Sequence, residues 1–167
     1  MNQRFAWGHI NINVRDLDAS IDFYRKLGFK PFIQGIPYLN LTADMLNTLP
    51  EGSAAGLGIP AGTRGRACIM QLDDGFPKID LTELDGLEQR EPLSNLDRGI
   101  VRLCLISQDL AADYERLEGA GVRFLSAPQT CQARMADIAT CVDPDGTLIE
   151  LLQVYLDRWP PLPSTGV

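Results

Sequence analysis

The order of apolar and polar positions near the start of the chain predicts a strand followed by a helix. Residues 5–14 alternate, with isoleucine and valine on one face and polar side chains on the other, which is typical of a strand with one buried face. Asp16 is a suitable N-cap for a helix that we expect to end near Leu27. Gly28 then suits the left-handed backbone that often follows a helix.

Three more strands are expected in this half of the chain, separated by a long irregular stretch. The strands cover residues 29–34, 66–72 and 77–84. Between the first two, we expect a short helix over residues 39–49 that ends at Pro50-Glu51-Gly52, followed by a flexible Gly- and Ala-rich segment. Long loops of this kind often cover binding sites.

The second half of the chain repeats the first. The run DLDASIDFYRKLGF from Asp16 to Phe29 matches DLAADYERLEGAGVRF from Asp109 to Phe124. In both halves an Asp-Gly turn then leads into a strand of the form Ile-acid-Leu. We expect a helix from Asp109 to about Gly119. The expected strands of this half cover residues 99–107, 122–126, 134–142 and 147–154.

This repeat predicts an α+β fold of two tandem βαβββ modules. A single four-stranded module would leave an apolar face and open edges exposed. We therefore expect the two sheets to pair into one eight-stranded curved sheet, a cup whose concave face suits a small molecule. The predicted parts are a first module, a linker, a second module and a Pro-rich tail, at residues 1–84, 85–98, 99–156 and 157–167.

Composition and charge narrow the class of partner. The 167 residues are 45% hydrophobic and carry a formal net charge of −7. That acidic balance argues against nucleic acid as a partner. No apolar run reaches the roughly 20 residues of a membrane span, and the N-terminus has no signal-peptide core. We therefore expect no membrane partner and a cytoplasmic location. The cysteines lack Cys-x-x-Cys spacing and are expected to be reduced thiols.

Four polar side chains occupy matching positions in strands that are otherwise apolar. His9 and Arg102 match in the first strands of the two halves, and Asp80 and Glu150 match in the last strands. A carboxylate on the inner face of a strand costs several kcal/mol unless it is paired or bound to a metal. We therefore expect these four side chains to form a shared interior site.

The same stretches resemble the vicinal oxygen chelate superfamily, also called the glyoxalase/bleomycin resistance protein/dioxygenase family. The resemblance spans most of residues 5–155 and is carried by GHININV from Gly8, the two helix runs, and DPDGTLIEL from Asp143. It implies paired βαβββ modules, a homodimer, and a divalent metal at the base of the cup. The ligand positions of metal-dependent relatives fall on His9, Asp80, Arg102 and Glu150.

Arg102 departs from that pattern, because a guanidinium stays protonated and has no lone pair for a metal. In the first interpretation no cofactor is needed. Arg102 replaces the metal, pairs with Asp80 and Glu150, and offers N–H donors to a substrate oxyanion, while His9 is the acid and base. In the second interpretation Arg102 points away, and His9, Asp80 and Glu150 bind a divalent metal such as Fe, Mn, Zn or Ni.

The function that these features favour is an enzyme acting on a small molecule by stabilising an enolate or oxyanion, of isomerase, lyase or oxygenase type. One alternative is a metal-free protein that binds a drug or antibiotic, and another is a metal-dependent glyoxalase, epimerase or dioxygenase. Tyr38 and Phe76 are candidate contacts for a flat substrate, and Arg134, on an expected strand, for an anionic one. Glu83 and Asp85 are expected to be solvated.

Overall fold

The computed structural model describes residues 5–88 and 90–160, and the chain divides into two compact units. The first unit is Met1–Glu91 and the second is Pro92–Val167. Each contains a βαβββ arrangement, so the fold class is α+β as predicted. The joining of the two sheets into one eight-stranded cup stays a prediction. Among the described residues, no helix is long and apolar enough to cross a membrane.

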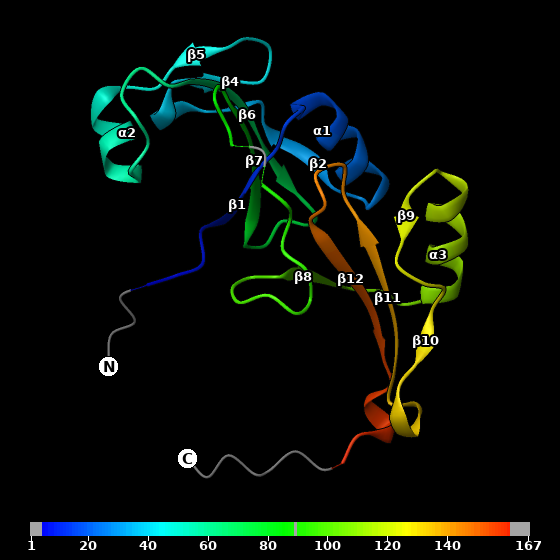
Figure 1. Cartoon of the computed structure of the whole chain (residues 1–167). Helices are drawn as coiled ribbons and strands as arrows, with labels where there is room; N and C mark the ends of the chain where they lie inside the picture. The colour runs from blue at the N-terminus through cyan, green and yellow to red at the C-terminus, as the bar shows by residue number, and fades with distance from the viewer. Residues whose placement is uncertain (1–4, 89, 161–167) are drawn as a thin grey trace. The chain divides into compact units, whose positions relative to one another are not determined.

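The sheet of the first unit is built around a parallel pair formed by its first and last strands. Its strand order is β1-β7-β6-β2 (Figure 1), where β1 pairs parallel with β7, and β6 pairs antiparallel with both β7 and β2. The bounds are β1 (His9–Asn13), β2 (Lys30–Ile33), β6 (Arg64–Gln71) and β7 (Lys78–Leu84). The predicted strands are therefore confirmed, with ends that shift by up to four residues, and β6 begins two residues earlier than predicted.

Helix α1 (Leu17–Lys26) packs against β6 and β7 and confirms the helix predicted after Asp16. The Asp16 side chain accepts a hydrogen bond from the Ala19 amide at 3.0 Å, as an N-cap does. The apolar stripe of the helix is buried, and its Tyr24 side chain is fully enclosed. Gly28 has φ 97°, the left-handed conformation predicted for it.

The segment between β2 and β6 differs from the prediction. Residues 35–48 form β3 (Gly35–Ile36), η1 (Pro37–Leu39), β4 (Leu41–Thr42) and β5 (Asn47–Thr48), so the helix expected over residues 39–49 is wrong. A helix begins instead where one was expected to end, as α2 (Glu51–Leu57). Pro50 marks a start because a helix leaves its first amide groups unpaired, and proline has none to lose.

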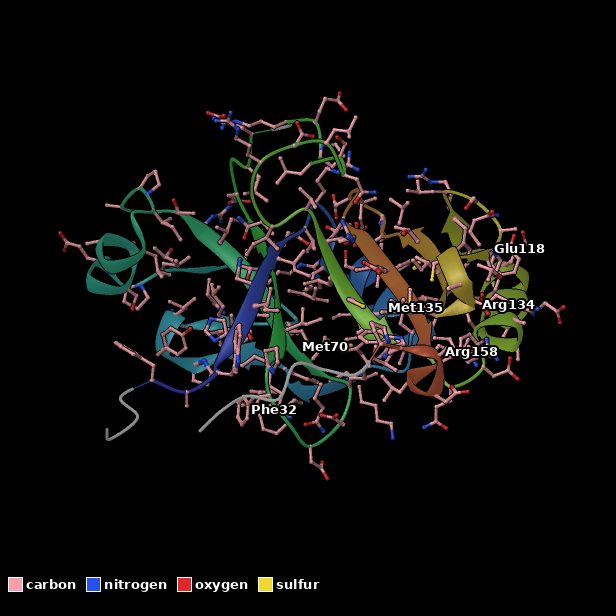
Figure 2. All side chains as sticks on the ribbon, turned by 90° about the horizontal axis from the view of Figure 1, so that it is seen from below. Phe32, Met70, Glu118, Arg134, Met135 and Arg158 are labelled. Carbon is pink, nitrogen blue, oxygen red and sulfur yellow. The ribbon has the colours of Figure 1, made fainter. Side chains whose placement is uncertain are left out.

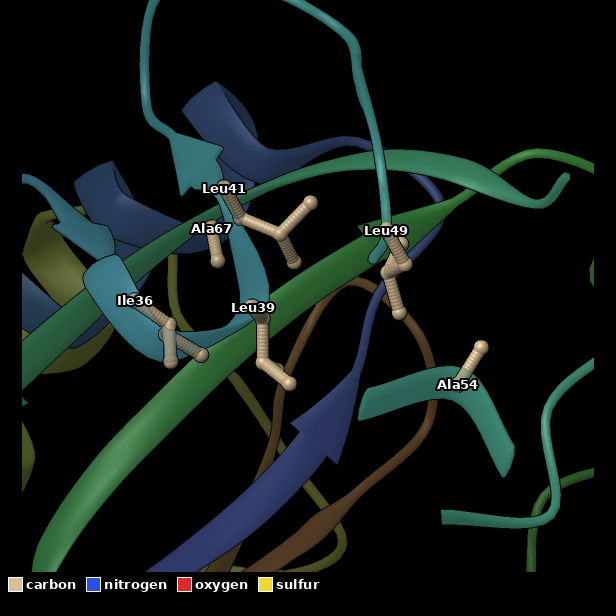
Figure 3. Packing of buried hydrophobic residues seen from close by; sticks show 6 residues of the cluster. All are labelled: Ile36, Leu39, Leu41, Leu49, Ala54 and Ala67. Atoms are coloured by element: carbon tan, nitrogen blue, oxygen red, sulfur yellow. The ribbon is translucent and has the colours of Figure 1, made fainter. Parts of the chain in front are cut away.

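A core cluster fixes this inserted segment to the sheet (Figure 3). The side chains come from β3, η1, β4, α2 and β6 and the turn before α2, and they are Ile36, Leu39, Leu41, Leu49, Ala54 and Ala67. All are buried. Each buried leucine or isoleucine stabilises the folded chain by about 1.5–3 kcal/mol relative to exposure, so these side chains fasten the insert to the first unit. The flexibility expected of the Gly- and Ala-rich segment stays a prediction.

The second unit repeats the arrangement with a shorter connection before its last two strands. Helix α3 (Leu110–Gly119) is capped by Asp109, as predicted, and packs against β11 and β12. The strand order is β10-β11-β12-β8, and β9 also pairs with β11. The bounds are β8 (Arg102–Ile106), β9 (Arg123–Phe124), β10 (Gln129–Thr130), β11 (Ala136–Val142) and β12 (Leu148–Val154).

Equivalent registers in the two parallel pairs make the repeat exact at the level of single residues. Asn11 of β1 lies opposite Asp80 of β7, and Cys104 of β8 lies opposite Glu150 of β12. His9 and Arg102 each stand two residues before these positions. The registers therefore confirm that His9 corresponds to Arg102, and Asp80 to Glu150.

A second equivalence lies at the helix starts, and it corrects the expectation that Glu83 is solvated. Glu83 Oε2 accepts the Leu17 amide of α1 at 2.7 Å. At the corresponding place in the second unit, Gln153 Oε1 accepts the Leu110 amide of α3 at 2.8 Å. An amide in the first turn of a helix has no partner within the helix, so a side chain of the last strand supplies one in both units.

Candidate functional site

The first unit contains a cavity of about 280 Å³ with one polar wall and one apolar wall. The polar wall consists of side chains from β1 and β7, namely His9, Asn11, Asn13, Asp80 and Thr82. The apolar wall is supplied by the inserted segment and the end of β7, namely Ile36, Leu39, Leu41, Leu49, Leu57, Ile59 and Leu84, with Tyr38 beside them. Small-molecule sites in proteins have this combination of apolar surface and a few placed polar groups.

Asp80 is the buried charge of this cavity. Its side chain is 1% exposed, and its Oδ2 atom lies 3.6 Å from His9 Nε2. Its Oδ1 atom is buried and has no hydrogen-bond partner among the described residues. Burial raises the pKa of Asp80, and the nearby His9 works in the opposite direction. A carboxylate oxygen held this way favours any hydrogen-bond donor that enters the cavity.

His9 faces the same cavity from the start of β1 and is 44% exposed. Imidazole is a common proton-transfer group in enzyme sites. The structure thus brings together two of the predicted catalytic residues, His9 and Asp80. The arrangement can perform acid–base chemistry on a molecule bound against the apolar wall.

A row of hydrogen bonds continues the polar wall along β1. Thr82 Oγ1 donates to Asn11 Oδ1 at 2.8 Å, and Asn11 Nδ2 donates to Asn13 Oδ1 at 2.9 Å. The Asn13 amide nitrogen can donate further, toward the cavity that it lines. Sequence reasoning placed Asn11 and Asn13 on the polar face of the strand but gave them no role. Their alternation with His9 was the available signal.

Tyr38, a predicted substrate-binding residue, also lines this cavity. It lies in η1, where Ser53 Oγ of α2 donates to its backbone carbonyl at 2.8 Å. Partial burial and the charge of Asp80 raise the pKa of the Tyr38 phenol. The phenol therefore stays protonated at neutral pH and can donate a hydrogen bond. Its contact with substrate stays a prediction.

In the second unit, Arg102 and Glu150 form an ion pair. Arg102 Nε donates to Glu150 Oε2 at 2.5 Å, and Arg102 Nη1 donates to Asn95 Oδ1 at 3.0 Å. Glu150 is 14% exposed, so its charge is partly removed from water and is balanced by the guanidinium. Asn95, from the segment predicted as a linker, was not expected to contribute here.

The donor set does not fit the four-ligand metal centre that the family resemblance implies. Arg102 holds one of the ligand positions and cannot bind a metal, and it occupies an oxygen of Glu150. Within either unit, the described His, Cys, Asp and Glu side chains form no group of three that could hold a metal ion. A three-ligand centre of His9, Asp80 and Glu150 stays a prediction.

The other two predicted substrate contacts lie outside the cavity wall. Phe76 precedes β7, is exposed, and packs its ring against the Lys78 ammonium. Arg134 is not on a strand as expected, because β11 begins at Ala136 and Arg134 has φ 54° in the turn before it. Arg134 lies beside Arg158 (Figure 2), whose Nη1 donates to the Arg134 carbonyl oxygen at 2.8 Å. Their roles in binding stay predictions.

Known proteins that resemble this chain agree with the fold. The family model for the Glyoxalase/Bleomycin resistance protein/Dioxygenase superfamily matches residues 6–151. The lactoylglutathione lyase of Pseudomonas aeruginosa is 25% identical over 169 residues, which cover 94% of this chain and 87% of that protein.

Solved structures extend the comparison to the backbone. A glyoxalase family protein from Bacillus cereus matches with a TM-score of 0.70 at 16% identity, covering 92% of this chain and 96% of that one. Glyoxalase I from Zea mays matches with a TM-score of 0.59 at 18% identity, covering 87% of this chain and 43% of that one. At these identities the structural matches bear on the fold alone.

Proposed function

Because the chain belongs to the glyoxalase/bleomycin resistance protein/dioxygenase superfamily, we propose that it is an enzyme that moves a proton on a small organic molecule. The substrate binds in the cavity of the first unit. The observation that carries the proposal is the His9–Asp80 pair, because it places a proton-transfer group and a buried carboxylate on one wall of a cavity with an apolar opposite wall.

In this proposal His9 removes a proton from a carbon next to a substrate carbonyl. The electron pair moves to the carbonyl oxygen as an enolate, and His9 returns the proton to a neighbouring atom. Asp80, 3.6 Å from the imidazole, positions it. The Asn13 amide and the Tyr38 phenol are donors on the same cavity that can stabilise the oxyanion. The catalytic roles predicted for Arg102 and Glu150, which form an ion pair in the second unit, stay predictions.

The reaction class is of lyase or isomerase type, which the name of the Pseudomonas aeruginosa relative supports. The proposal needs no metal, since the chemistry is assigned to His9 and to hydrogen-bond donors. Titration of the purified protein with Mn, Fe, Ni and Zn, followed by calorimetry, tests the metal-dependent alternative. Stoichiometric binding that His9→Gln and Asp80→Asn abolish would favour a metal centre over this proposal.

The test of the His9 role is proton exchange into a panel of small carbonyl compounds in deuterated water, followed by NMR. We expect His9→Gln to slow exchange and turnover by about 10²–10⁴-fold, the usual contribution of a general base. Lys30→Gln is the matched control, because Lys30 is exposed on β2 and does not line the cavity. Unchanged exchange by His9→Gln would contradict the assignment.

A second candidate function is a protein that binds a small molecule without changing it. The apolar wall of the cavity favours it, because that wall alone can retain an apolar ligand. A ligand that raises the melting temperature and is recovered unchanged indicates a binder, whereas a consumed ligand indicates an enzyme. A homodimer and a cytoplasmic location also stay predictions. Sedimentation of the purified chain measures its oligomeric state.

A further inference from the structure

The cavity of the first unit is lined, where the structure describes it, by a carboxylate and by no lysine or arginine. Among the described residues that line it, Asp80 is the carboxylate, His9 is the imidazole, and none is lysine or arginine. Asp80 is nearly fully buried, and its Oδ1 atom has no partner there. A buried carboxylate oxygen in this position attracts a cationic or neutral donor and disfavours a second anion.

The cations on neighbouring strand positions are engaged elsewhere. Lys78, two residues before Asp80, donates its Nζ to Gln71 Oε1 and to the Asp73 carbonyl, both at 3.0 Å. Arg66 of β6 pairs with Glu83 and with Asp18 of α1. Within the first unit, Lys78 and Arg66 are therefore bound to residues that do not line the cavity.

The apolar wall determines the size and polarity of the rest of the ligand. Apart from Tyr38, the insert side chains that line the cavity are aliphatic and offer no hydrogen bonds, among them Ile36, Leu41 and Leu49. An apolar cavity of about 150 Å³ is large enough for benzene. The 280 Å³ here leaves room for an aromatic ring with a short chain attached.

We infer that this cavity selects small molecules with an apolar body that ends in a protonated amine, and that it rejects the matching carboxylate. The amine lies against the Asp80 carboxylate, which lines the cavity, while the apolar body lies against the insert. This substrate class rests on the proposed function, since it describes the same cavity. The described lining of the cavity contains no lysine or arginine to receive an anion.

Three probes of one shape test the inference on the full chain: 4-phenylbutylamine, 4-phenylbutan-1-ol and 4-phenylbutanoate. Binding is measured by calorimetry and by NMR shifts of the backbone amides of β1 and β7. We expect the amine to bind tightest, the alcohol next, and the carboxylate at least about tenfold more weakly than the amine, as loss of a hydrogen bond to a charged group predicts. Asp80→Asn should weaken the amine about ten- to hundredfold and leave the alcohol nearly unchanged.

Two further variants keep the result interpretable. Asp74→Asn removes the same charge from an exposed turn outside the cavity and should leave the order of the probes unchanged. Leu57→Trp fills the cavity from an exposed position of α2, so that folding is retained, and should weaken all three probes.

Equal binding of the amine and the carboxylate would overturn the inference, and so would an order that survives Asp80→Asn, or the absence of binding by all three probes. Failure of the proposed function looks different. Proton exchange would then be absent or independent of His9, while the order of the three probes would stay as expected.

Discussion

Replacement of Glu83 tests how the start of α1 is fastened to the sheet of the first unit. Glu83 is 21% exposed, and its Oε2 atom accepts hydrogen bonds from the Leu17 amide at 2.7 Å and from Arg66 Nε and Nη2 at 3.1 and 2.9 Å. Arg66 is itself 20% exposed and also donates to Asp18 at 2.8 Å. One carboxylate therefore joins a helix terminus to a half-buried cation.

The size of the effect follows from these contacts. Glu83→Ala removes the acceptor of a helix-start amide, which costs about 1 kcal/mol. It also leaves Arg66 with only the exposed Asp18 as an ionic partner, and a hydrogen bond to a charged group contributes about 1.5–3 kcal/mol. We expect the free energy of unfolding to fall by about 2–4 kcal/mol.

Glu83→Gln separates the two contributions. The second unit shows that glutamine can fill the role, because Gln153 accepts the Leu110 amide from the equivalent position. Glu83→Gln should therefore keep the helix-start hydrogen bond, lose the ionic part, and cost about 1–2 kcal/mol. The two variants should differ by about the value of one helix cap.

The measurements are urea unfolding followed by circular dichroism and the exchange rate of the Leu17 amide. Leu17 exchange should accelerate in Glu83→Ala and change less in Glu83→Gln. The Leu110 amide of the second unit is the internal control and should keep its rate. The reasoning fails if both variants lose equal stability, or if Glu83→Ala lies within about 0.5 kcal/mol of the parent, the range of ordinary surface substitutions.

The remaining predictions concern turn and helix positions. Gly35→Ala should destabilise the chain by about 2–3 kcal/mol in a thermal melt, because Gly35 has φ 152° and an added Cβ would lie 2.4 Å from the Leu41 carbonyl oxygen. Gly56→Ala in α2 should instead stabilise the chain by about 0.5–1 kcal/mol, because an added Cβ there meets nothing within 4 Å. Equal effects of the two substitutions would refute this reasoning. Burial raises the pKa of Asp143 above its ordinary 3.8, so the native parent loses stability as pH rises from 4 to 7 and this carboxyl gives up its proton. Asp143→Asn has no such proton to lose and should gain stability relative to the parent over this range. Melting temperatures that differ by a constant amount from pH 4 to 7 would contradict this.

Patterns of alternation and capping were enough to predict the repeated scaffold. Strand β1 and helices α1 and α3 follow from period-two and helical spacing with Asp16 and Asp109 as caps. The insert between β2 and β6 was not predictable in this way, because strands of two residues are too short to show alternation. Pro50 was ambiguous, since proline both ends one helix and begins another.

The polar half of the site was visible in the sequence, and the apolar half was not. Asp80 stands out because it interrupts an apolar strand, and His9 because it is the one histidine of the sequence and lies on the strand that pairs with it. The wall opposite them comes from residues that are distant along the chain and that meet only once the insert has folded. Glu83 was misjudged for a related reason, because its partner, the Leu17 amide, is a backbone group that no side-chain pattern reveals.

The two copies therefore carry different chemistry on one scaffold, and the difference has two separate sources. At matching strand positions the first unit has His9 and Asp80, and the second has Arg102 and Glu150. The first unit also has the long insert between β2 and β6, which supplies the apolar wall of its cavity. In the proposed function, His9 sets the reaction, whereas Asp80 and the insert residues set which molecules bind. Substitutions at His9 should change rate with little change in the set of bound molecules, whereas substitutions at Leu57 should change that set first.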